Sequence, residues 1–495
     1  MKSLKTKPLT NVVYIFLGNI FGQLSLLLLT PVLTRIYPPE YFGKYGLFVS
    51  ILSIFSTIIC LKYELAIMLP KDDKDSSSIL ILCLIISLIF GGFLLSIFFL
   101  FSPQISSYLQ WEYFNKVIII LVISFILKGL SNSINEWNSR KERYIRYSLS
   151  YFINSFITFS SPLLLYVLSI HFVNNLIIGV LIGNTISFSF LLFFTLKKDF
   201  TFFKQKINLS KITYNFHKYF DFPRFTTIAS LINEVSWQIP SFAIAAYFSK
   251  EALGYYTLAF GMIKLPVSLM SKSISQVFYQ RISEEKGSAK IVQIVEKMVI
   301  ILTKVSIPFI ITLFLFSPNI FSFIFSKPYS EAGKYVQILS PWIFIWFLSS
   351  PLSRILFVYE KQKSDLYINL LILISRLIAF IVGVLNKNLY LALFLYSLLG
   401  VVSYGYLIIK ALKIANVEII NLTRLIFSNS LSIFLFSIPL LILKFIVAND
   451  FLVFAFMAIL LIGYYLYEFT KNPYMSKFFL ELKEITTQHE RSIHK

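Results

Sequence analysis

The chain alternates long apolar runs with short polar connections that are mostly basic. A helix needs about 20 apolar residues to cross the hydrocarbon core of a bilayer. The runs of this kind predict fourteen spans, with edges accurate to a few residues: 11–36, 41–69, 78–102, 116–137, 144–170, 173–196, 219–248, 252–280, 292–316, 335–359, 366–386, 388–412, 424–447 and 450–469. The pattern therefore predicts an all-α polytopic membrane protein.

The basic residues of the connections predict the orientation of these spans. With odd-numbered spans running outward, about 29 of the 45 Lys and Arg fall in inner loops and tails, as the positive-inside rule requires. Outer connections such as 171–175 are short and nearly neutral. The first apolar run is too long for a signal peptide and is expected to be a span. Both termini are expected in the cytoplasm.

Three short segments recur along the chain. Glu, Gly, Tyr and Leu of the stretch 37–47 return in 248–258 at an offset of 211, and the tetrapeptide 100–103 returns as 315–318 at an offset of 215. A third set of matches has an offset of 220: Lys141, Arg143 and Tyr147 with Lys361, Lys363 and Tyr367. Because the matches are collinear, they predict two copies of one six-helix lobe. An even number of helices makes this a parallel repeat about an axis normal to the membrane, an arrangement typical of secondary transporters.

The predicted organisation follows from this duplication. An N-terminal six-helix lobe occupies 1–196 and a C-terminal six-helix lobe occupies 219–412, with a basic cytoplasmic linker at 197–218 between them. Helices thirteen and fourteen (413–470) lie outside the repeat, and 471–495 form a cytoplasmic tail. The linker is mildly amphipathic, which favours contact with anionic lipid of the inner leaflet. A solvated linker is the alternative.

Composition supports the membrane class and excludes others. Hydrophobic residues make up 57% of the chain and charged residues 14%, with a mean hydropathy of +0.75. The net charge of +21 is explained by the loops, so it does not indicate nucleic-acid binding. Cys60 and Cys83 lie in apolar runs and are expected to be packing residues. The four histidines lack ligand spacing, so no metal site is predicted.

Charged residues inside the predicted spans are the candidate functional residues, because an ionisable group in the membrane normally faces a polar cavity. Span eight carries Lys264, Ser268, Lys272 and Gln276 on one face. Span four carries Ser124, Lys128 and Asn135 on a similar stripe, with Asn132 nearby. Five further bases are Lys62, Arg224, Lys304, Arg354 and Arg376. The basic excess predicts a cavity for an anionic substrate, held by Lys264, Lys272, Lys128, Arg224, Lys62 and Arg376. Snorkelling or local pairing is the alternative reading, above all for Arg354 and Lys62.

Two other features predict how such a carrier works. Glu234 and Glu64 are the candidate coupling groups, with H⁺ or Na⁺ as the coupling ion; a structural ion pair of Glu234 with Arg224 or Lys264 is the alternative. Pro31 and Pro240 occupy comparable places before the shared motif, so a bend at each is expected to let the lobes flex, unless the kinks are static. The acidic run 72–75 has no catalytic domain around it, and the chain is not expected to be an enzyme.

The segments 33–37, 40–45 and 62–71 resemble the polysaccharide transporter family, the oligosaccharide flippase branch of the multidrug/oligosaccharidyl-lipid/polysaccharide exporter superfamily. The resemblance implies a carrier in the bacterial cytoplasmic (inner) membrane. Its substrate would be a polyprenyl-diphosphate-linked oligosaccharide, such as an O-antigen (lipopolysaccharide) or capsule repeat unit. It would need no cofactor, and polysaccharide polymerase or assembly proteins would be its partners.

Two alternatives remain beside this reading. A cation-coupled small-molecule exporter of the same superfamily would be expected to have acidic rather than basic spans. A membrane-embedded glycan polymerase or ligase would be expected to carry a large outer loop, whereas the outer loops predicted here are short.

Overall fold

The computed structural model describes residues 7–112, 114–170, 172–203, 209–288, 290–428, 431–446 and 450–471, and these are helical apart from short turns. They form two compact units, Met1–Gly254 and Tyr255–Lys495. This division by contacts differs from the predicted division into repeated lobes, because the seventh span packs within the first unit. The predicted domain boundaries stay a prediction. The 472–495 part of the expected tail lies outside the described residues.

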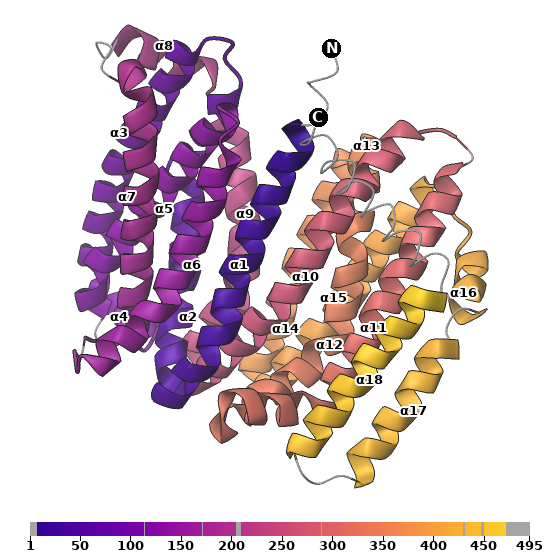
Figure 1. The fold of residues 1–495 in the computed structure, drawn as a ribbon. Helices are drawn as coiled ribbons and strands as arrows, with labels where there is room; N and C mark the ends of the chain where they lie inside the picture. Colours follow the sequence, from indigo (N-terminus) through magenta and orange to yellow (C-terminus); the bar gives the residue numbers. More distant parts are fainter. Residues whose placement is uncertain are drawn as a thin grey trace, which may run out of the picture. The chain divides into compact units, whose positions relative to one another are not determined.

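The first unit is a bundle of long helices with shorter ones at its ends. Its helices are α1 (Lys7–Ile36), α2 (Pro39–Ile58), α3 (Asp73–Leu100), α4 (Ser102–Tyr108), α5 (Phe114–Arg140), α6 (Tyr144–Val167), α7 (Asn175–Phe203), α8 (Leu209–Lys218) and α9 (Ile228–Tyr247). A 3₁₀ helix (Tyr63–Met68) follows α2, and a π-helix (Phe222–Thr227) precedes α9. Figure 1 shows α3, α5, α6 and α7 side by side, with α8 across one end of α3. The centre of the bundle is α5, which buries Phe125 and Trp137 completely.

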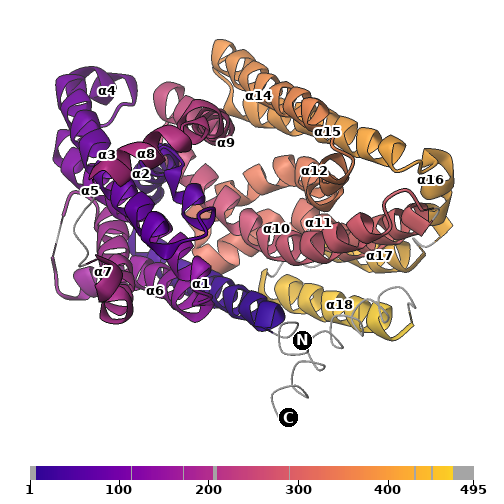
Figure 2. The ribbon, with the colours of Figure 1, turned by 90° about the horizontal axis from the view of Figure 1, so that it is seen from above.

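The second unit is built around α11 and α12. Its helices are α10 (Lys250–Glu284, which begins in the first unit), α11 (Lys290–Phe325), α12 (Ser330–Leu352), α13 (Arg354–Val358), α14 (Gln362–Leu385), α15 (Leu389–Ile414), α16 (Ile419–Ser428), α17 (Leu431–Ile446) and α18 (Asp450–Lys471). A 3₁₀ turn (Lys327–Tyr329) joins α11 to α12. Figure 2 shows the hairpin of α14 and α15 at one edge of this unit, with α17 and α18 at another edge beside α11.

The predicted linker between the lobes is largely helical. The first residues of the linker continue α7 to Phe203, residues 204–208 lie outside the described part, and α8 makes up the rest. This helix is docked on α3, since Asn215 donates to Ser78 at 2.7 Å and Lys211 pairs with Asp75 at 2.8 Å. Tyr63 donates to the Phe216 carbonyl at 2.8 Å. These contacts show a linker held on protein; contact with anionic lipid stays a prediction.

The all-α membrane fold is confirmed. Ten helices of the described residues are long and apolar enough to cross a membrane, or eleven if the bent pair of α16 and α17 forms one span. The count of fourteen is not confirmed and stays a prediction. The helices α6, α9 and α10 have 24, 20 and 35 residues. Helices α6 and α9 fall short of the apolar criterion rather than the length, because they carry polar side chains. In α10 several side chains from residue 266 onward lie outside the described residues.

The duplication is visible in the backbone. Helices α6 and α14 both have 24 residues and start 218 positions apart, at Tyr144 and Gln362. Each helix begins two positions after a residue in the left-handed region, Glu142 (φ 55°) before α6 and Glu360 (φ 56°) before α14. Another left-handed residue lies two positions beyond the end of each helix. The offset of 220 predicted for this region is therefore wrong by two residues: Arg143, with φ −99°, is equivalent to Lys361, with φ −96°.

The first parts of the repeated motif contact each other. Gly43 in α2 and Gly254 in α10 lie at equivalent positions of the two copies, and each packs against the other helix start. A Cβ on Gly43 would lie 1.9 Å from the Lys250 carbonyl oxygen, and one on Gly254 would lie 1.9 Å from the Pro39 carbonyl oxygen. Pro39 and Lys250 are also separated by 211 residues, so the contact is reciprocal. It requires glycine in both copies because backbone atoms occupy the space of any side chain.

Replacing either glycine should destabilise the protein. Gly43→Ala and Gly254→Ala each force the backbones of α2 and α10 apart, and we expect a loss of roughly 1–3 kcal/mol. Thermal unfolding of the purified protein in detergent measures it. Gly261→Ala is the matched control: Gly261 lies in α10, and a Cβ added there would meet no atom within 4 Å, so this change should be neutral or stabilising. Equal effects at all three positions would contradict the close packing.

Candidate functional site

One candidate residue, Arg376, lies in an aromatic cage in the second unit. It comes from α14 and is only 5% exposed. Its neighbours Tyr396, Gly400 and Tyr404 recur every four residues along α15, which places them on one face of that helix. Trp342 of α12 closes the cage. Three helices therefore converge on one guanidinium group.

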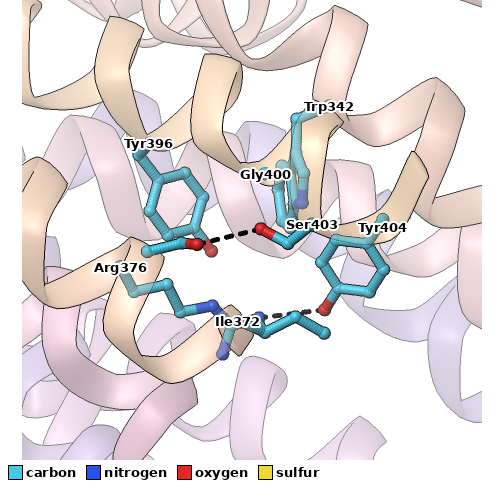
Figure 3. Close-up of a pocket in the computed structure, with 8 residues that line it drawn as sticks. Trp342, Ile372, Arg376, Tyr396, Gly400, Ser403 and Tyr404 are labelled. Atoms are coloured by element: carbon cyan, nitrogen blue, oxygen red, sulfur yellow. Dashed lines mark hydrogen bonds between the residues drawn. The ribbon is translucent and has the colours of Figure 1, made fainter. Parts of the chain in front are cut away.

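The cage holds the charge with neutral groups (Figure 3). Arg376 Nη2 donates to the Tyr404 hydroxyl at 3.1 Å, and its Cζ lies 5.9 Å from the centroid of the Tyr396 ring. The Ser375 and Ser403 hydroxyls bond at 3.0 Å beside it. A desolvated guanidinium over an aromatic face gains about 2 kcal/mol or more. Such a site tolerates a cation without placing a carboxylate in the membrane.

The cage is closed in this structure. Its internal volume available to water is about 10 Å³, which is room for about one water molecule. Gly400 allows Trp342 to pack closely against α15, because a Cβ at position 400 would lie 2.3 Å from Cδ1 of Trp342. A diphosphate does not fit this space, so a substrate-binding role of Arg376 requires the cage to open and stays a prediction.

A second cluster of charges lies in the first unit, where the chain leaves α2. Leu61 and Lys62 both adopt the left-handed region, with φ of 49° and 60°, which is costly for residues other than glycine. This turn brings Lys62 Nζ to 3.5 Å from Glu64 Oε1. The local pairing that was the alternative for Lys62 is therefore present. Span two does not continue as one helix to residue 69.

Glu64 is the most unusual member of this cluster. The residue is 7% exposed, and its second carboxylate oxygen, Oε2, has no hydrogen-bond partner. The carboxyl of Glu136, at the end of α5, lies within electrostatic range of both Glu64 and Lys62. Two acids and one base thus share a largely buried region. An acceptor without a protein partner in such a place is rare, and a water, an ion or a proton would satisfy it.

Three other candidates of the first unit are separate from this cluster. Lys128 of α5 is partly buried, and no acid of the described residues lies within 4.0 Å of its amino group. Arg224 lies in the π-helix and is exposed, with its guanidinium 5.1 Å from the Phe225 ring. Glu234 of α9 accepts a hydrogen bond from Gln238 at 2.8 Å, one turn along the same helix. The structure shows this bond and no ion pair with Arg224.

The lysine stripe of span eight lies on one continuous helix, α10. Lys264 is exposed, and its amino group lies 5.9 Å from the Phe260 ring. The side chains of Lys272, Ser268 and Gln276 lie outside the described residues. Pro31 and Pro240 lie inside α1 and α9. Their conformational role stays a prediction.

Sequence reasoning identified the charges but missed their partners. Tyr396, Tyr404 and Trp342 were not singled out, although the four-residue spacing of Tyr396, Gly400 and Tyr404 is visible in the sequence. Glu136 was also missed. Among the described residues, no group of His, Cys, Asp and Glu is arranged to hold a metal ion.

Comparison with known proteins identifies the family. Residues 32–334, more than half of the chain, match the family described as "Polysaccharide biosynthesis protein". The chain belongs to this family. The resemblance inferred from the motifs is thereby confirmed. No curated protein matches the chain.

Solved structures share the fold of this polysaccharide biosynthesis protein. A structure of the lipid II flippase MurJ in an inward closed conformation has a TM-score of 0.73 and 16% identity, and the match covers 96% of this chain and 99% of that one. An inward-facing multidrug resistance transporter of the MATE family and MOP superfamily has a TM-score of 0.59 and 14% identity, with 84% and 96% covered. At these identities the likeness shows the fold.

The aromatic cage can be tested through its hydroxyl acceptor. Tyr404→Phe removes the oxygen that accepts from Arg376, and we expect a loss of about 1–3 kcal/mol of stability because a buried donor loses its partner. Tyr406→Phe, an exposed tyrosine on the same helix, should have no effect. Arg376→Lys should also destabilise, since an ammonium group lacks the planar fork. Thermal unfolding in detergent compares the three; similar values for both tyrosine variants would refute the cage.

Proposed function

We propose that this protein is a flippase that moves a polyprenyl-diphosphate-linked oligosaccharide from the inner to the outer leaflet of the bacterial cytoplasmic membrane by alternating access. Its product would serve the assembly of a cell-surface polysaccharide such as O-antigen or capsule. The single observation that carries the proposal is membership of a polysaccharide biosynthesis family together with the fold of the lipid II flippase MurJ. A lipid-linked sugar is the substrate class that this combination supports.

The basic residues inside the helices support an anionic head group. Arg376 and Lys128 are buried or partly buried bases, and no carboxylate of the described residues lies within 4.0 Å of Lys128. Bases of this kind are costly in hydrocarbon unless they face water, a polar partner or a substrate. A diphosphate offers several charge-assisted hydrogen bonds to such groups. Lys264 and Arg224 are exposed and are therefore accessible to such a head group.

The second candidate function is cation-coupled export of a small molecule. It is favoured by the fold similarity to the multidrug transporter of the MATE family. The higher TM-score of the lipid II flippase and the basic candidate residues favour the flippase. An enzyme remains the least favoured reading, because the family and the fold point to transport.

The accumulated intermediate in a strain lacking this protein distinguishes the three functions. A flippase predicts lipid-linked oligosaccharide on the cytoplasmic leaflet and no surface polysaccharide. A polymerase or ligase predicts the same lipid on the outer leaflet. An exporter of small molecules predicts normal surface polysaccharide with increased sensitivity to toxic compounds.

Substrate binding is expected to depend on the lysines of α10. Lys264→Ala and Lys272→Ala should each reduce glycan export several-fold at unchanged protein level, and the Arg variants should be milder, because the positive charge is kept. Export is measured as surface polysaccharide in the complemented deletion strain. Lys413→Ala, an exposed lysine in the last turn of α15, is the control and should export normally. Full export by the Lys264/Lys272 double alanine variant would remove these residues from the mechanism.

Coupling to H⁺ or Na⁺ is expected to use Glu64 in preference to Glu234. Oε2 of Glu64 is buried and has no protein hydrogen-bond partner, whereas Oε1 of the less buried Glu234 accepts from Gln238. Transport into vesicles, with and without an imposed pH or Na⁺ gradient, measures the response. Glu64→Gln should abolish the stimulation by the gradient and leave basal transport. The same loss in Glu234→Gln, with Glu64→Gln responding normally, would reverse the assignment.

A further inference from the structure

Helix α11 has a proline in its interior, Pro308, where a helix is expected to bend because its backbone hydrogen bonding is incomplete. Pro308 has no N–H, so the carbonyl of Lys304, four residues earlier, lacks the i→i−4 hydrogen bond of a regular helix. Both residues are buried. A buried carbonyl in a membrane protein must find a partner within the protein, because no water is available.

The last helix of the described chain supplies that partner. The Tyr464 hydroxyl of α18 donates to the Lys304 carbonyl at 3.2 Å. The adjacent Tyr465 hydroxyl donates to the Val305 carbonyl at 2.8 Å. Two consecutive carbonyls at the bend of α11 are therefore bonded by α18, which lies about 160 residues further along the chain.

A buried ion pair joins the same two helices. Lys304 Nζ lies 3.1 and 3.0 Å from the two carboxylate oxygens of Glu468, with side-chain exposures of 8% and 1%. Glu468 lies one helical turn after Tyr464, so both act from one face of α18. Ser432 of α17 donates to the same carboxylate. Lys304 is thus locally paired.

Apolar packing continues the contact along α11. Leu315 and Phe316 pack in one buried cluster with side chains of α17 and α18, including Phe436, Leu440 and Met457. The polar contacts at the bend and the apolar contacts beyond it hold one side of α11 over several turns. Both helices of the C-terminal pair take part.

We propose that α17 and α18 are a brace that fixes the proline bend of α11, so that these three helices move as one body during transport. Opening the ion pair would leave two uncompensated buried charges and an unbonded carbonyl, a strongly unfavourable state. The bend at Pro308 is therefore a permanent feature of shape. Tyr464, Lys304 and Glu468 are positioning residues, and movement in this unit takes place at other points.

A double-mutant cycle tests the bond at the bend. Tyr464→Phe should lower the melting temperature of the purified protein in detergent by roughly 2–4 °C. In a Pro308→Ala background, the new N–H at position 308 bonds the Lys304 carbonyl, so Tyr464→Phe should then have little effect. Tyr465→Phe is the matched control. The residue four positions after Val305 is Phe309, which has a backbone N–H, so the effect of Tyr465→Phe should be the same in both backgrounds. Additive effects of Pro308→Ala and Tyr464→Phe would overturn the proposal.

An apolar replacement of the ion pair tests whether the brace is permanent. Glu468→Gln alone should reduce the amount of folded protein strongly, since Lys304 stays charged and loses its counter-ion. The pair Lys304→Met with Glu468→Leu should restore folding and retain wild-type glycan export. A folded double variant that no longer exports would show that the pair opens during transport, against the proposal. The export measurement rests on the proposed flippase function, whereas the melting-temperature cycle does not. Failure of the brace and failure of the flippase function are therefore distinguishable.

Discussion

Hydrocarbon offers no hydrogen-bond partners, and this constraint decides where the helices of this protein contact one another. At two interruptions of the regular helical backbone, a side chain from a distant helix bonds a carbonyl group. Arg140 of α5 donates to the Ile67 carbonyl at 3.3 Å, beside the break after α2. Tyr464 does the same for α11. These two interruptions of the regular backbone are therefore points of tertiary contact.

Most of the helices were predictable because length and hydropathy define most of the spans, although the count of fourteen stays a prediction. The repeat was also predictable, but its register was wrong by two residues at α6 and α14. The reason is physical: the equivalence is set by left-handed residues that end or precede helices, and here those residues are Glu142 and Glu360 rather than glycine. Glycine would have marked the turns in the sequence. The similar Lys, Arg and Tyr residues nearby gave a plausible but shifted match.

The charged candidates were predictable one by one, but their environments were not. The distance of a charge from its partner along the chain explains the difference. Lys62 and Glu64 are neighbours in sequence, and their pairing was foreseen as an alternative. Arg376 depends on two tyrosines about 20 to 28 residues away and on Trp342, and Lys304 depends on Glu468, 164 residues away. A single sequence contains no signal for such long-range partners.

The separation of Lys304 and Glu468 has a consequence for biogenesis. The ribosome adds residues at about 5 to 20 per second, so Glu468 follows Lys304 by on the order of ten to thirty seconds. During this interval α11 resides in or beside the insertion machinery with an unneutralised amino group and an open carbonyl. Insertion of α18 supplies both partners together. Helix α18 therefore completes a helix that was synthesised well before it, and a nascent chain stopped between the two would expose a defined site for quality control.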